Sequence, residues 1–169
     1  PSTVENPHDR KALTQLAATT PARIRVGRAG TRYTTATLLR FRADHAAAKE
    51  AVLSEVKSEL LARLGVLEVR SRADDKRHFL QRPDAGRALS DKARAQIAEK
   101  LPKRPQLQII YGDGLSAEAI NTNLEALHGA LEKELGARGV KPNPPLFIYV
   151  SRVKIMDEVA RLLECEACL

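Results

Sequence analysis

Two compact, largely apolar segments, separated by a long amphipathic helix, constrain the fold of this chain more than any other feature of its sequence. The segments are LQIIY (107–111) and LFIYV (146–150), and continuous apolar runs of this length are typical of strands covered on both faces. Between them, apolar residues recur at helical intervals and share one face. They are Ile120, Leu124, Leu127, Leu131 and Leu135. The pattern predicts a strand–helix–strand unit with parallel strands.

A second unit of the same kind follows the first. A shorter helix is predicted at about 156–163, and CEACL (165–169) has the pattern of the start of a further strand. Upstream, residues 66–69 form a short strand candidate. We therefore expect an α/β fold, with a Rossmann-like parallel layer over residues 66–169 that is incomplete at its C-terminal end.

The connections carry ordinary helix and loop signals. Ser90 and Ser116 are placed to cap helices through their hydroxyl groups, and Pro102 ends the first of these helices. The polar stretch that leads to Asp84 predicts a loop, in which Asp75 is interpreted as a cap or a solvated group.

The N-terminal part of the chain predicts helices. Asp9 is placed to cap a short helix, and Thr34 or Thr35 a longer one. Apolar positions of the longer helix share one face with a histidine, which we interpret as a hydrogen-bonded core residue. They are Leu38, Phe41, His45, Ala48 and Val52. A last helical stretch ends at Gly65, so residues 1–65 are predicted to form a helical N-terminal region.

The composition is that of a globular chain with an excess of positive charge. Of 169 residues, 43% are hydrophobic and 29% charged, and 28 Lys and Arg against 21 Asp and Glu give a net charge of +7. The excess is densest in six arginines. They are Arg23, Arg25, Arg28, Arg32, Arg40 and Arg42. Such a cluster fits a solvated face, an acidic partner surface or a phosphate backbone, and the sequence leaves all three open.

Several classes of protein are excluded or disfavoured. No apolar run approaches the roughly 20 residues of a membrane-spanning helix, and the start of the chain lacks the layout of a signal peptide. Two cysteines, Cys165 and Cys168, make no disulfide framework, so we expect a cytoplasmic protein; one such pair without a histidine cluster predicts no zinc site. No residue pattern marks a catalytic centre, so we expect this chain to contribute binding.

The predicted topology indicates where a ligand binds. In open parallel sheets, ligands lie beyond the carboxyl ends of the strands. Here those ends are the loops GDGLS (112–116) and SRVK (151–154). The glycines of the first loop permit close approach to the backbone, although a tight turn explains them equally well. The helix that begins near Ser116 presents free N–H groups. We expect a ligand large enough to contact both loops.

Seven segments stand out together along the chain. They are VENPH (4–8), ARIRVGRAG (22–30), LLRFRADHAAAK (38–49), LEVRS (67–71), RPDAGR (82–87), GDGLSAEAI (112–120) and SRVKIMDEV (151–159). In this order and spacing they resemble one family, the small subunit of ethanolamine ammonia-lyase. The resemblance implies a complex with a large TIM-barrel subunit that carries the catalytic residues. It also implies adenosylcobalamin, a cobalt corrinoid, between the two subunits, and a lyase reaction that converts ethanolamine to acetaldehyde and ammonia.

The resemblance implies cofactor contacts for this chain and no catalytic or metal-binding residue. The family's GRVKI segment, whose valine contacts cobalamin, matches residues 151–155, with Ser151 in place of the glycine. Val153 is therefore the implied contact, and Arg152 is a second candidate beside it. A glutamate in a GERPG motif and a later cysteine, which also contact the cofactor in the family, have no counterpart before Leu169. We expect a chain truncated at its C-terminus and inactive in isolation.

Further expectations follow from the resemblance, and two rival hypotheses stand beside it. The family implies ethanolamine catabolism in a bacterial microcompartment. It also adds docking of the large subunit as an alternative to solvation for the arginines that flank the GRAG motif, which are Arg23, Arg25, Arg28 and Arg32. The first rival is a non-enzymatic module that self-associates through a strand edge near residues 146–150. The second is a nucleic-acid-binding protein that uses the arginine-rich region, although an aromatic content of 4% leaves few residues for base stacking.

Overall fold

The computed structural model describes residues 4–169, and their contacts divide the chain into two compact units. The first unit ends at Glu50 and the second begins at Ala51. None of the helices in the described residues has the length and apolar character of a membrane span. We describe each unit by itself.

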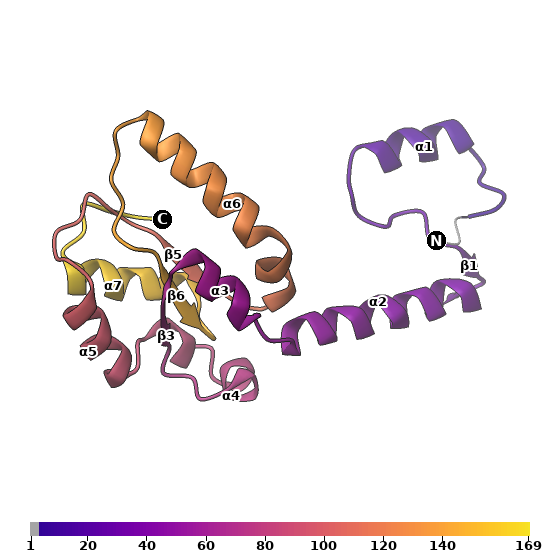
Figure 1. The fold of residues 1–169 in the computed structure, drawn as a ribbon. Helices are drawn as coiled ribbons and strands as arrows, with labels where there is room; N and C mark the ends of the chain where they lie inside the picture. The colour runs from indigo at the N-terminus through magenta and orange to yellow at the C-terminus, as the bar shows by residue number, and fades with distance from the viewer. Residues whose placement is uncertain (1–3) are drawn as a thin grey trace. The chain divides into compact units, whose positions relative to one another are not determined.

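The N-terminal unit consists of two helices and a short antiparallel hairpin (Figure 1). Its elements are α1 (Arg10–Ala18), β1 (Arg28–Ala29), β2 (Arg32–Tyr33) and α2 (Thr35–Leu53), the last of which continues into the second unit. The predicted cap of α1 is confirmed, because the Asp9 carboxylate accepts a hydrogen bond of 2.8 Å from the Ala12 N–H. The hairpin turns at Gly30, which has a φ of +60°.

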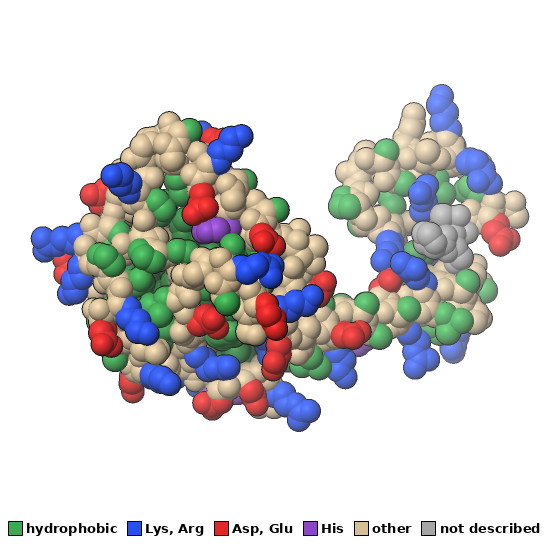
Figure 2. All heavy atoms as spheres, viewed as in Figure 1, with side chains coloured by type: hydrophobic (Ala, Val, Ile, Leu, Met, Phe, Trp, Pro, Cys, Tyr) green, Lys and Arg blue, Asp and Glu red, His purple; other side chains and the backbone are tan. Residues whose placement is uncertain are grey.

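Very little of the N-terminal unit is buried. Among residues 4–50 only Gly27 is buried, and Figure 2 shows green apolar side chains at the surface of this unit among blue Lys and Arg. Leu38 and Phe41 are 45% and 63% exposed, and His45 is exposed as well. The prediction that His45 belongs to a core is therefore wrong. The helix forms, but residues 4–50 supply no second layer for this face to pack against.

The C-terminal unit contains the sheet and the remaining helices. Its helices are α3 (Ser58–Leu64), α4 (Lys76–Gln81), α5 (Asp91–Lys100), α6 (Ala117–Ala137) and α7 (Met156–Leu163), with two 3-10 turns, η1 (Ala85–Arg87) and η2 (Val153–Ile155). Its strands are β3 (Leu67–Arg70), β4 (Leu107–Gln108), β5 (Ile110–Gly112), β6 (Leu146–Tyr149) and β7 (Ala167–Cys168). Ser90 and Ser116 cap α5 and α6 as predicted, each accepting a hydrogen bond from a backbone N–H.

The strands run parallel, with β6 in the centre. The order is β3–β6–β5, and Ile148 is in register with Val69 on one side and with Gly112 on the other. The predicted strand at 107–111 is divided in two: β5 pairs with β6, whereas β4 pairs with β7 in parallel. The expected α/β fold is thus confirmed.

Helices cover both faces of the sheet (Figure 1). Leu146 and Ile148 point to the face covered by α5 and α7, while Phe147 points to the face covered by α3 and α6. All three side chains are fully buried, which explains the continuous apolar run of β6. Because α3 packs on the sheet through Leu60 and Leu61, residues 51–65 lie with the C-terminal unit, whereas the predicted division fell after residue 65.

The polar stretch predicted as a loop contains helix α4. Asp75 caps this helix through a 2.7 Å hydrogen bond from the His78 N–H to its carboxylate. Phe79 is fully buried in a small cluster that includes Val150. A six-residue helix that buries one apolar side chain has no visible periodicity, so the sequence pattern predicted a loop instead.

Candidate functional site

A pocket lies at the carboxyl ends of β5 and β6, where the chain changes direction. The connection after β5 passes over the α6 face of the sheet, and the connection after β6 passes over the α7 face. Such a reversal between neighbouring parallel strands opens a crevice for ligands. The pocket there has a volume of about 270 Å³, and both predicted loops line it. Its loop residues are Gly112, Gly114, Ser151, Arg152 and Val153.

Val153 is the most exposed of the large apolar side chains at this site. It begins the turn η2 and is 84% exposed to solvent. Two residues on, Ile155 is buried in the core, and its N–H donates a 2.9 Å hydrogen bond to the Arg152 carbonyl. The turn is therefore anchored from below while Val153 points outward, which presents an apolar surface to anything that enters the pocket.

Arg152 is held beside Val153 by its backbone and by an aromatic ring. Its N–H donates a 2.7 Å hydrogen bond to the Gly86 carbonyl, and its guanidinium carbon lies 4.7 Å from the centre of the Phe79 ring. A Cβ on Gly86 would approach that ring within 2.5 Å, so glycine is required there. The Arg152 Nε is buried and has no hydrogen-bond partner among residues 4–169. The site thus contains one unpaired donor.

A second, larger pocket adjoins the same strand ends on the face covered by α3 and α6. Its volume is about 500 Å³, and Lys76, Asp113 and Tyr149 contribute to its lining. The Tyr149 hydroxyl donates a 2.6 Å hydrogen bond to the Glu68 carboxylate. Burial of the phenol, together with that carboxylate, raises the pKa of Tyr149, so the hydroxyl stays protonated and acts as a donor.

Sequence reasoning found the two loops but missed the side chains beneath them. Arg152 and Val153 line one pocket together, as the topology predicted for the loops. Lys76 and Asp113, however, form a buried ion pair between residues that are 37 positions apart in the sequence. Lys76 lies in the stretch predicted as a loop, and no local pattern links it to Asp113. Only the contact between the two side chains in the structure reveals this pair.

Cys168 lies on β7, which pairs with β4, and Cys165 lies between α7 and this strand. Both are partly buried. Burial, and secondarily the neighbouring Cys165 thiol, raises the pKa of Cys168 to about 11, so its thiol stays protonated at neutral pH. Within residues 4–169, no group of three or more His, Cys, Asp or Glu is arranged to hold a metal ion.

Comparisons with known proteins agree with the resemblance. The family described as "Ethanolamine ammonia-lyase light chain (EutC)" matches residues 10–169. The "Ethanolamine ammonia-lyase small subunit" of Clostridium acetobutylicum is 44% identical over 157 residues, which are 93% of this chain and 65% of that protein. The protein of the same description from Clostridium perfringens is 44% identical over 156 residues, which are 92% of this chain and 53% of that protein.

The chain spans between about half and two thirds of the length of these curated relatives. Nearly all of the chain takes part in each match, and the matched region includes both loops of the pocket. On this evidence the chain belongs to the family of ethanolamine ammonia-lyase light chains, also described as small subunits.

Proposed function

We propose that this chain binds adenosylcobalamin through the loop after β6 and forms one side of a corrinoid site whose other side belongs to the large subunit of an ethanolamine ammonia-lyase. Val153 is the main contact, and Arg152 is the second. The enzyme would convert ethanolamine to acetaldehyde and ammonia. The large subunit would supply the catalytic residues, so this chain would be inactive alone.

The observation that carries this proposal is the exposed valine at the pocket. An apolar side chain 84% exposed loses contact with water when it is covered, and burial of a valine contributes about 1.5 kcal/mol or more. The corrin ring offers a broad, flat face of the kind that a single protruding side chain can contact. Val153 also stands in the segment that resembles the cobalamin-binding GRVKI motif.

The remaining residues of the pocket fit a corrinoid as well. Gly114 has no side chain to cover the backbone after β5, which allows a large ligand to approach closely, whereas Gly112 makes room for the Ser151 hydroxyl. The Nε of Arg152 has no acceptor among residues 4–169, so this donor is unsatisfied within the described chain. The amide and phosphate oxygens at the periphery of a corrinoid are acceptors for such a group.

In this proposal the chain positions and shields the cofactor. When bound, adenosylcobalamin supplies a cobalt–carbon bond that breaks to start a radical reaction. Val153 would cover part of the corrin face and exclude water from it. Arg152 would fix the rotation of the ring by holding one peripheral group. The large subunit is the proposed partner in a hetero-oligomer, and a bacterial microcompartment is the proposed location.

The proposal is tested with the chain assembled with a matching large subunit. Adenosylcobalamin is titrated into the complex, and binding is followed by the visible absorption of the corrinoid after size-exclusion chromatography. Val153→Asp should weaken binding about tenfold or more, because it removes an apolar contact and desolvates a charge. Leu127→Asp is the matched control, because Leu127 is 52% exposed on α6, outside the residues that line the pocket.

Two results would overturn the proposal. The first is a Val153→Asp complex that binds the corrinoid as tightly as the unmodified complex. The second is a chromatogram in which the unmodified chain elutes without the large subunit and without the corrinoid. Equal weakening by Leu127→Asp would show that the loss does not arise at the pocket, and it would count against Val153 as the contact.

A further inference from the structure

The loop that presents Val153 begins with a buried residue in an unfavourable backbone conformation. Val150, which follows β6, has a φ of +55° and is 4% exposed. A β-branched residue at positive φ is a genuine outlier, because its Cβ crowds the neighbouring carbonyl. Such conformations persist only where the surroundings hold them, and they gather at functional sites.

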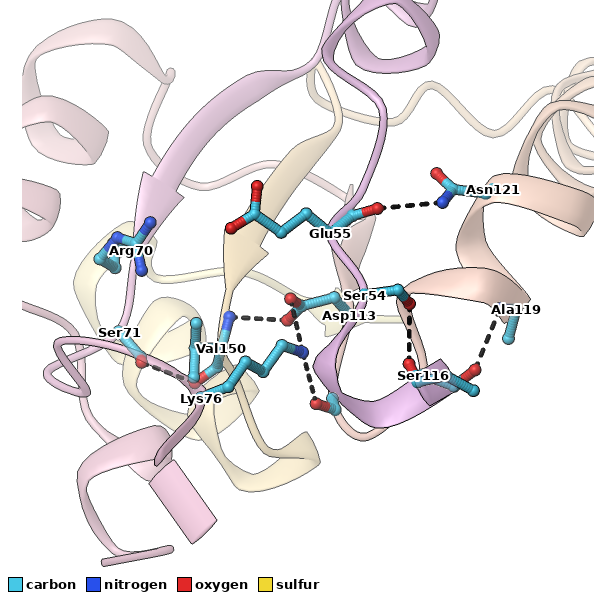
Figure 3. A network of polar contacts seen from close by, with 12 residues as sticks. Ser54, Glu55, Arg70, Ser71, Lys76, Asp113, Ser116, Ala119, Asn121 and Val150 are labelled. Carbon is cyan, nitrogen blue, oxygen red and sulfur yellow. Dashed lines mark hydrogen bonds and ion pairs between the residues drawn. The ribbon is translucent and has the colours of Figure 1, made fainter. Parts of the chain in front are cut away.

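Two side chains fix the peptide groups on either side of Val150 (Figure 3). The Asp113 carboxylate accepts a 2.6 Å hydrogen bond from the Val150 N–H. The Ser71 hydroxyl donates a 2.7 Å hydrogen bond to the Val150 carbonyl. These side chains come from the ends of β5 and β3, the strands on either side of β6. Residues at the ends of both strands that flank β6 therefore form hydrogen bonds with the same residue, Val150.

Lys76 completes this arrangement. Its ammonium group lies 2.8 Å from the other oxygen of Asp113 and donates a 3.0 Å hydrogen bond to the Gly114 carbonyl. The Asp113 side chain is 3% exposed and that of Lys76 is 13% exposed. Without the ammonium, the buried carboxylate would lack a charge partner, which is strongly unfavourable in an apolar environment. Lys76 therefore holds the Asp113 carboxylate in place as the acceptor for the Val150 N–H.

We propose that the Lys76–Asp113 pair, together with Ser71, is a positioning device that holds Val150 in its left-handed conformation and so presents the exposed Val153 at the pocket formed by the carboxyl ends of β5 and β6. This inference rests on the proposed function, because it assigns the held loop to cofactor binding. Lys76, Asp113 and Ser71 are positioning residues. They act on the cofactor only through the backbone of residues 150–153.

The first test measures the loop in the chain alone, without cofactor. In Asp113→Asn, an amide NH2 group faces the Lys76 ammonium in place of a carboxylate oxygen, so the side chain is no longer held against Val150. Hydrogen exchange at the amides of residues 150–153 should then accelerate about tenfold, while the amides of β6 keep their protection. Ser71→Ala is the milder second variant: it removes one hydrogen bond and leaves no charge unpaired. It should accelerate the same amides less. If neither variant changes their exchange, the device does not hold the loop and the proposal is overturned.

The second test measures adenosylcobalamin affinity in the complex with the large subunit. Asp113→Asn and Lys76→Met should each weaken binding about tenfold. The double variant Lys76→Met/Asp113→Asn should bind more tightly than Lys76→Met, because the neutral amide oxygen still accepts from Val150 and no buried charge is left alone. If the loss of adenosylcobalamin affinity in the double variant equals the sum of the losses in the two single variants, Lys76 and Asp113 do not act as a pair.

A matched control separates positioning from general loss of stability. Asn143 is buried at the opposite ends of the strands, where its amide donates hydrogen bonds to Gln108 and to the Pro102 carbonyl. Asn143→Ala should lower the free energy of unfolding without changing exchange in residues 150–153 or cofactor affinity. If it weakens binding as much as Asp113→Asn, or if the loop of Asp113→Asn loosens with no loss of affinity, the positioning role is overturned.

The outcomes also separate this inference from the function on which it rests. Tight binding by Val153→Asp, or no binding by the unmodified complex, overturns the proposed function; loop exchange in the isolated chain still decides whether the device holds Val150. Conversely, a complex sensitive to Val153→Asp but insensitive to Asp113→Asn keeps the proposed function and overturns the positioning role.

Discussion

The two units of this chain contain similar helices but bury very different amounts of them. Phe147, on the central strand of the C-terminal unit, is 0% exposed, whereas Phe41, on α2, is 63% exposed. The C-terminal unit surrounds its sheet with helices on both faces, so each apolar side chain of β6 meets a second layer. The N-terminal unit is held by a helix cap, a short hairpin and ion pairs.

This difference shows what an apolar helical pattern does and does not indicate. Intervals of three and four residues predict a helix in both units, and both helices form. The pattern places apolar side chains on one face, but it does not say that the chain itself covers that face. Most of the stability of a helix in a protein comes from the packing of its apolar face against other elements. The N-terminal unit should therefore open far more readily than the C-terminal unit.

The largest expected effect tests the two phenylalanines against each other. Phe147→Ala should lower the free energy of unfolding of the C-terminal unit by about 3–5 kcal/mol, because it leaves a cavity in a closed core. Phe41→Ala should change it by about 0.5 kcal/mol or less, as exposed positions do. Urea titrations followed by far-UV circular dichroism measure both. Similar losses in the two variants would show that Phe41 is buried in solution, and the comparison would fail.

A smaller effect of opposite sign comes from glycines that lack neighbours. Gly129 lies within α6, and a Cβ there would meet nothing within 4 Å. Gly129→Ala should therefore raise the stability of the C-terminal unit by about 0.5–1 kcal/mol. Gly30 is equally open, but its φ of +60° makes alanine unfavourable, so Gly30→Ala should loosen the hairpin and leave the C-terminal transition unchanged. A shift of that transition by Gly30→Ala would show that the units unfold together.

Local sequence signals predicted much of the C-terminal fold. Ser90 and Ser116 were identified as caps from their positions, and both accept the expected hydrogen bonds. The apolar runs marked β6 and most of β4 and β5, because a strand buried on both faces has little choice of side chain. Helix α4 was missed because its one fully buried residue, Phe79, makes its contacts with distant segments.

The candidate site was predictable only in its outline. Parallel strands place their carboxyl ends together, so the two loops could be expected at one pocket. The conformation of Val150 could not be predicted, because valine disfavours positive φ. The groups that hold Val150 in this conformation are distant from it in the sequence. Lys76 and Asp113 are ordinary charged residues in the sequence. Their positioning role is indicated only by the structure, where the two side chains are in contact and largely shielded from solvent.

The smallest effect concerns the ion pairs of the N-terminal unit, where charge replaces apolar packing. Asp44 forms ion pairs with Arg23 and Arg40, and a hydrogen bond from Arg23, followed by the charges of both arginines, holds the pKa of Asp44 below its ordinary value of 3.8. Because the folded pKa is lower than the unfolded one, the stabilisation is complete above pH 3.8 and is lost as the pH falls through the lowered value.

Hydrogen exchange of the α2 amides between pH 6 and pH 3, corrected for intrinsic exchange, should therefore show protection falling near the acidic end of the range. Asp44→Asn should show the lower protection at every pH, because it cannot form the charged pair. Added salt should reduce the difference in protection between the wild-type chain and Asp44→Asn, since the ion pairs of Asp44 are exposed and salt screens them. If wild type and Asp44→Asn give the same profile, the ion pairs do not order this unit. The N-terminal unit would then rest on its cap and hairpin alone, which makes its contrast with the packed C-terminal unit sharper.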